Sequence, residues 1–164
     1  MTDEGSPGRV PDDVAYRHIL LSITGLLQNR PGVASVRVPS CPDWTVRDLV
    51  AHLVGICDSV VRGGDGGPPG GRERSGTDVA APDLSVLLTR WSELSGLAGR
   101  YLAEADPRHS GLAVLDALSH ELDLRYALDA PIPADHPALP GAFAVAAAGF
   151  SAEVADRGLP AIEL

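Results

Sequence analysis

Prolines and glycines divide this chain into five apolar stretches, and each stretch has the spacing of a helix. In the first, Ile19, Leu20, Ile23 and Leu27 recur with a period near 3.6 residues, which places them on one helix face. Prolines stand between the stretches, because inside a helix they remove a hydrogen bond and clash with the preceding turn. The pattern predicts helices over residues 12–28, 46–62, 84–105, 110–128 and 139–158.

Aromatic residues make up only 4% of the 164 residues, so packing depends on leucine, valine and alanine. Such a composition suits helices better than a β-sandwich. Residues 33–38, VASVRV, predict at most a short strand or an extended lead-in, and residues 159–164, LPAIEL, resemble the start of a strand. A chain of this length is in the range of one domain. We therefore expect residues 1–164 to form a single all-α bundle of four to five helices.

Local signals mark two helix ends and one loop. Thr45 is a candidate N-cap, with Asp48 three residues later as an aspartate variant of the capping box, and Gly158 occupies a C-cap position. Residues 63–81 are expected to form a flexible loop, since glycine and charge dominate its first part. The loop lacks the GK[ST] ending of a phosphate-binding loop.

Composition excludes several classes of partner. The formal charge of −9 repels a nucleic-acid backbone and an anionic membrane surface. No window of about 18 apolar residues is present that would predict a membrane span. The two cysteines, Cys41 and Cys57, show no CxxC spacing, and the N-terminus lacks the apolar core of a signal peptide. A cytoplasmic protein that binds neither nucleic acid nor membrane is expected.

Titratable residues recur on the apolar faces of two predicted helices. His52 lies among Leu49, Leu53 and Ile56 on the second helix, and Asp116, His120 and Asp123 fall within about 60° of one another on the fourth. A carboxylate and a histidine at i and i+4, with a histidine from a neighbouring helix, offer a divalent metal three ligands and leave one position open. Asp123 is placed to orient an imidazole or a bound water.

The alternative is that these residues are ordinary core and surface groups. A lone histidine on a core face is more often a packed residue than a ligand, and Asp116 with His120 also fits a simple ion pair. At 100° per residue, Glu121 and Arg125 are expected on the side of the fourth helix opposite to His120, away from the core. The remaining side chains with possible chemical roles are expected on the surface (His18, His109, His136), in a loop (Cys41) or as packing residues (Cys57, Trp44, Trp91).

Two segments resemble the mycothiol-dependent maleylpyruvate isomerase family, part of the DinB-like group of metal-binding up-and-down four-helix bundles. Residues 38–55, VPSCPDWTVRDLVAHLVG, resemble the family's CPGWTVRDLVAHL segment, and residues 116–128, DALSHELDLRYAL, resemble its E-x-x-x-H-x-x-D helix. The resemblance implies such a bundle with an additional short helix or C-terminal extension. It also implies that His52, Asp116 and His120 bind a divalent metal, with zinc as the expected ion, and that mycothiol is the thiol cosubstrate.

The sequence departs from the family pattern at two points. Asp116 replaces the family's glutamate, a side chain longer by one methylene, so its reach falls by about 1.5 Å. The family's isomerases also continue into a smaller C-terminal domain, which is expected to be absent from a chain that stops at Leu164.

Two hypotheses of different classes remain from the sequence. The first is a metal-dependent isomerase or thiol transferase that joins a small-molecule thiol to a small electrophilic substrate. The second is a non-catalytic bundle that binds a metal or small ligand, or serves as an interaction module, with a degenerate site. Substrate and metal identity are left open, and so is oligomeric state, with a homodimer as one option.

Overall fold

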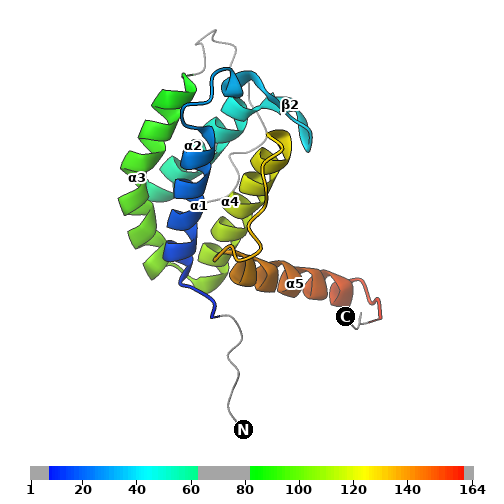
Figure 1. Ribbon diagram of the computed structural model, residues 1–164. Coiled ribbons are helices and arrows are strands. Elements are labelled where there is room, and N and C mark those ends of the chain that lie inside the picture. Colours follow the sequence, from blue (N-terminus) through cyan, green and yellow to red (C-terminus); the bar gives the residue numbers. More distant parts are fainter. Residues whose placement is uncertain (1–7, 63–81, 161–164) are drawn as a thin grey trace, which may run out of the picture.

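Four helices pack into a bundle, as the sequence predicts. The computed structural model describes residues 8–62 and 82–160, with α1 (Asp12–Leu27), α2 (Val46–Val61), α3 (Leu84–Glu104) and α4 (Pro107–Ala127) in the bundle and α5 (Leu139–Asp156) beside it (Figure 1). The predicted loop at 63–81 and most of the strand-like ending, 161–164, lie outside the described residues. The expected all-α, DinB-like architecture is confirmed.

α1 and α4 run in one direction and α2 and α3 in the other (Figure 1). α1 packs against α3 and α4, and α2 packs tightly against α3. The fourth side, between α2 and α4, has far fewer contacts. Side chains on this side are therefore less crowded by the opposite helix, which leaves room for polar groups.

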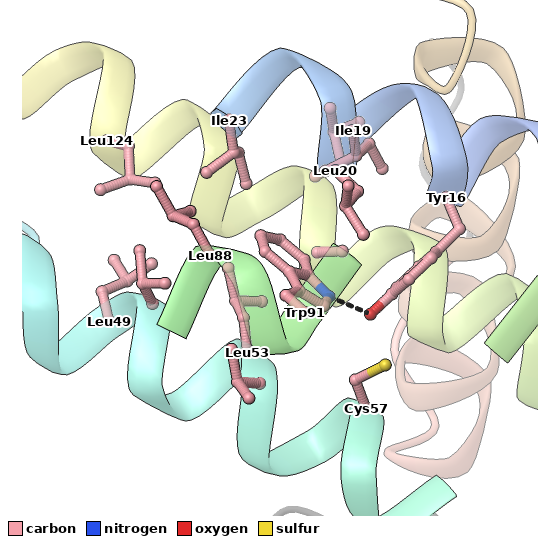
Figure 2. Close-up of a cluster of buried hydrophobic side chains, with 14 of the residues drawn as sticks. Tyr16, Ile19, Leu20, Ile23, Leu49, Leu53, Cys57, Leu88, Trp91 and Leu124 are labelled. Atoms are coloured by element: carbon pink, nitrogen blue, oxygen red, sulfur yellow. Dashed lines mark hydrogen bonds between the residues drawn. The ribbon is translucent and has the colours of Figure 1, made fainter. Parts of the chain in front are cut away.

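The core of the bundle is built around Trp91 of α3, which is fully buried (Figure 2). Its indole Nε1–H donates a hydrogen bond of 3.2 Å to the Tyr16 hydroxyl from α1. Cys57 of α2 points toward the same hydroxyl, and burial raises the pKa of its thiol. Trp91 and Cys57 are thus packing residues, as predicted.

A small hairpin leads into α2. A 3-10 turn, η1 (Val33–Ser35), is followed by the antiparallel strands β1 (Arg37–Val38) and β2 (Cys41–Thr45). Cys41 belongs to β2, so its predicted position in a loop was wrong. The Thr45 side chain accepts the backbone N–H of Asp48, whose carboxylate accepts the N–H of Thr45, so the predicted capping box is present. This box sets where α2 begins, and hence where its side chains point.

The prediction for α4 was wrong in its start and in its buried face. The helix begins at Pro107, three residues early, because a proline at the first helical position loses no intrahelical hydrogen bond. Its buried face includes Val114, Leu118 and Glu121, whereas Asp116 and His120 are half-buried. Leucines occur around the whole circumference of α4, so apolar spacing alone did not identify the core face.

The chain returns along α4 after Ala127 and then forms α5, which projects away from the bundle (Figure 1). Near the end of α5, Gly158 has φ +64°, and its N–H donates to the carbonyl of Ala155. The left-handed conformation there confirms the predicted C-cap glycine.

Candidate metal site

Three potential ligands meet between α2 and α4. His52 of α2 and Asp116 and His120 of α4 each place one ligand atom so that all three atoms lie within 4.8 Å of one another. The two imidazole rings are 5.1 Å apart, with their planes at 86°. The structure thus brings together the three residues that the sequence singled out, on the side of the bundle where helix contacts are fewest.

The two nitrogens of His120 face different carboxylates. Nδ1 lies 3.2 Å from Asp123 Oδ2, and Nε2 lies 3.7 Å from Asp116 Oδ1. An ionised carboxylate only accepts hydrogen bonds, so Asp123 favours the tautomer that carries its proton on Nδ1. The Nε2 lone pair is then free on the side of Asp116 and His52. Asp123 therefore lies where the sequence placed it, beside the imidazole that it would orient.

The hairpin contributes Ser40, which sequence reasoning missed. Its hydroxyl donates a hydrogen bond of 2.6 Å to Asp123 Oδ1, so Ser40, Asp123 and His120 form a continuous chain. Ser40 binds the carboxylate oxygen that does not face the imidazole, so it holds the Asp123 side chain in its orientation toward His120. No local pattern could have identified Ser40, because 83 positions separate the two residues.

Trp44 forms one wall of the site. Its ring centroid lies 5.0 Å from that of His52 and 6.4 Å from that of His120. Trp44 was expected to be a packing residue, and it does pack, but against the two candidate ligands. Its position at the end of β2, directly before the α2 capping box, could have suggested this role.

Burial keeps the His52 imidazole neutral. Loss of solvent lowers its pKa, the nearby His120 lowers it further, and Asp116 partly opposes both effects. A neutral imidazole is the form that binds metals. Burial, together with Asp123, raises the pKa of the neighbouring Cys41 thiol, which therefore lacks the character of a thiolate nucleophile.

The donor set fits a divalent metal. Two imidazoles and one carboxylate are ligands that zinc accepts in catalytic sites, at bonds of about 2.0–2.2 Å. Ligand atoms around one tetrahedral zinc are roughly 3.3 Å apart by the same bond lengths. Because the three atoms already lie within 4.8 Å, small side-chain rotations bring them to that spacing. The Asp116 side chain is 43% exposed, against 15% for His120, so of the two candidate ligands on α4 it lies nearer to solvent.

A second polar cluster lies on the opposite face of α4, and here the predicted exposure of three residues was wrong. Glu121 lies on the side away from His120, as expected, but that side is buried, and His136 is buried rather than on the surface. Glu121 accepts hydrogen bonds from Arg125 at 2.8 Å and Ser22 at 2.6 Å, while His136 Nε2 lies 3.1 Å from its other oxygen. Arg125, expected to face outward, is largely buried beside it.

This second cluster holds residues 128–138, which connect α4 to α5, against the bundle. Arg125 also donates to the carbonyl of Pro131, and His136 Nδ1 accepts the N–H of Ala138. His136 Nε2 consequently carries the proton toward Glu121, which satisfies the buried carboxylate. All of its groups have partners, so the cluster is structural. His18 and His109 are exposed, as expected.

Comparison with known families agrees with the geometry. The mycothiol maleylpyruvate isomerase N-terminal domain family matches residues 29–129, a span that holds the hairpin and all three candidate ligands. The chain belongs to this family. No curated protein and no solved structure matches the chain significantly. Within the described residues, no helix combines the length and apolar character needed to cross a membrane.

Proposed function

We propose that this member of the mycothiol maleylpyruvate isomerase N-terminal domain family binds a divalent metal, zinc, through His52, Asp116 and His120. We further propose that it uses mycothiol in an isomerisation or thiol transfer on a small electrophilic molecule. The observation that carries the proposal is the convergence of these three ligand atoms within 4.8 Å, inside the segment that matches the family.

Each residue has a distinct role in this proposal. His52 contributes a neutral imidazole, because burial lowers its pKa. Asp123 holds the proton of His120 on Nδ1 and leaves Nε2 to bind. Asp116 brings the negative charge and lies at the solvent side, where a cosubstrate would enter. Trp44 covers the two rings and limits the access of water.

When bound there, the metal supplies positive charge that lowers the pKa of a coordinating thiol. Three protein ligands leave a position open for such a thiol. The reaction would take place in the cytoplasm, the compartment that the two free cysteines favour. An electrophile with a conjugated double bond that returns as its isomer would establish an isomerase, and a stable adduct would establish a transferase.

The test is zinc affinity, measured by competition with a chelator. His52→Ala and His120→Ala should each raise the dissociation constant by more than the roughly 10- to 100-fold typical of outer-shell changes. Asp116→Ala should also weaken binding, while the bundle stays folded because this side chain is 43% exposed. His109→Ala, on an exposed side chain of the same helix, is the matched control and should bind zinc as the wild type does.

The outcomes separate the hypotheses. If Asp116→Ala binds zinc as tightly as the wild type, the metal is held by the two histidines alone, and the proposed catalytic role is ruled out. A wild-type protein that binds zinc stoichiometrically but joins mycothiol to no electrophile would instead be the non-catalytic, metal-binding bundle.

A further inference from the structure

α5 presents an apolar face that the bundle leaves uncovered. Its only buried residues are Gly141 and Ala142, near the start of the helix. Phe143 is 69% exposed and Phe150 is 59% exposed. Figure 1 shows the helix extending away from the bundle, and no residue of α5 beyond Ala142 is buried. Two exposed phenylalanines on one helix are unusual unless another surface covers them.

The phenylalanines lie on the side of α5 that points away from α4. Gly141 and Ala142 are buried, and Val145 lies against Gly111 of α4, where a Cβ would come within 2.8 Å of Val145 Cγ2. At 100° per residue, Phe143 and Phe150 are about 140° around the helix from the centre of that contact. The bundle to which α5 is attached therefore does not obstruct their face.

The spacing of this face is symmetric along the helix. Phe143 and Phe150 are seven residues apart, and Ala146 and Ala147 lie midway between them on the same side. When a second α5 lies antiparallel with the same midpoint, Phe143 of one helix faces Phe150 of the other, and Ala146 faces Ala147. In a two-fold interface both copies present the same surface, so the order of side chains along the helix must be the same in both directions. The Phe–Ala–Ala–Phe face of α5 meets this requirement.

We propose that α5 pairs with α5 of a second copy of this chain, antiparallel, around a two-fold axis near Ala146 and Ala147. Phe143 of each copy then packs against Phe150 of the other, at both ends of the contact. The alanines in the middle allow the helix axes to approach to the short end of the usual 8–10 Å range.

Charge favours the antiparallel arrangement. Glu153 is in the last turns of α5, where a negative charge is unfavourable for the dipole of its own helix. The same two-fold axis places Glu153 beside the first turn of the other α5, which carries the positive end of the dipole. A parallel pair would bring the two Glu153 side chains together instead. Arg157 pairs with Glu153 in each copy and limits the size of this effect.

The area of the face sets the expected strength. Two phenylalanines at 69% and 59% exposure offer about 250 Å² per copy, given about 200 Å² for a whole ring. Together with Ala146, Ala147 and Val154, two copies would bury roughly 700–800 Å², an area typical of weak, reversible contacts. We therefore expect a reversible dimer, with a dissociation constant around 1–100 μM or weaker.

Sedimentation velocity on the full chain across that concentration range tests the pairing. The wild type should shift from monomer to dimer, and Phe150→Asp should weaken the dimer on the order of 100-fold, since it removes both aromatic contacts. Tyr126→Asp is the matched control, because Tyr126 is 72% exposed on α4 and outside the proposed interface. Unchanged helical circular dichroism in both variants confirms that α5 is folded.

Cross-linking tests which side of α5 forms the contact. Ala147→Cys should form an intermolecular disulfide on mild oxidation, and Ala144→Cys, on the other side of α5, should not. A wild type that stays monomeric overturns the proposal, as does a dimer that Phe150→Asp does not weaken. A monomer that binds anionic or neutral lipid vesicles through Phe143 and Phe150 also overturns it and assigns the face to a membrane surface.

Discussion

Two glutamate–arginine pairs in this protein have the same spacing and opposite burial, which allows a controlled test of the second polar cluster. Glu121–Arg125 and Glu153–Arg157 are both i, i+4 pairs with Nε–Oε1 distances of 2.8 and 2.6 Å. Glu121 is fully buried, whereas both side chains of the second pair are more than half exposed. A difference between the pairs therefore reflects burial and the further hydrogen bonds that Arg125 makes to Ser22 and Pro131, rather than the spacing within the pair.

Arg125→Met keeps the apolar stem of the side chain and removes all of its hydrogen bonds to Glu121, Ser22 and Pro131. The variant leaves a buried carboxylate without its cationic partner, so we expect a loss of about 3–5 kcal/mol in the free energy of unfolding. Arg157→Met should cost about 0.2–0.5 kcal/mol, as exposed helix pairs do. The ratio between the two losses is then roughly tenfold by these values.

Urea unfolding at neutral pH, followed by circular dichroism, measures both variants against the wild type. Glu121→Gln combined with Arg125→Met should recover most of the loss, because it removes the uncompensated charge and keeps an acceptor for His136 Nε2–H and Ser22. Equal costs for Arg125→Met and Arg157→Met would refute the argument, and so would a double variant as unstable as Arg125→Met alone.

Three further predictions concern His136, Ser40 and Thr45. Burial lowers the pKa of His136 below its usual 6.5, so as the pH falls the unfolded chain takes up a proton before the folded chain does. The free energy of unfolding should therefore decrease as the pH drops below 6.5. In urea titrations from pH 7.5 to pH 5, His136→Gln should lose this part of the pH dependence. Ser40→Ala should raise the zinc dissociation constant a few-fold, less than the roughly 10- to 100-fold expected for Asp123→Ala, and Ser40→Thr should restore it if the hydrogen bond is responsible. Thr45→Ala should cost about 0.5–2 kcal/mol of unfolding free energy through loss of the capping box, and equal stability would show that tertiary contacts alone define the start of α2.

Local features of this fold were predictable because their physical cause is local. The capping box at Thr45 depends on residues three apart, and the C-cap at Gly158 depends on one backbone conformation. The pairing of Asp116 with His120 follows from one helical turn. Spacing suggested His52 as a third ligand but does not show which helices are neighbours, so the family resemblance strengthened that hypothesis.

Features that depend on distant contacts were missed or misplaced. Glu121 looked like a surface residue because its partners Ser22 and His136 come from other parts of the chain. His136 is flanked by prolines, which predict a loop but not that the loop is held against α4. Ser40 likewise gains its role only when the hairpin contacts α4. A buried ionic cluster therefore shifted the core face of α4 away from the one that apolar periodicity suggested.

The central claim is that His52, Asp116 and His120 hold a metal that accepts a thiol, and cobalt substitution tests it most directly. Cobalt(II) added to metal-free protein should bind with a stoichiometry of one per chain and give the visible absorption of a low-coordinate site. Adding mycothiol should then produce a thiolate-to-cobalt charge-transfer band, which His120→Ala lacks and His109→Ala retains. Cobalt binding that is absent in the wild type, or unaffected by loss of His120, would contradict the account.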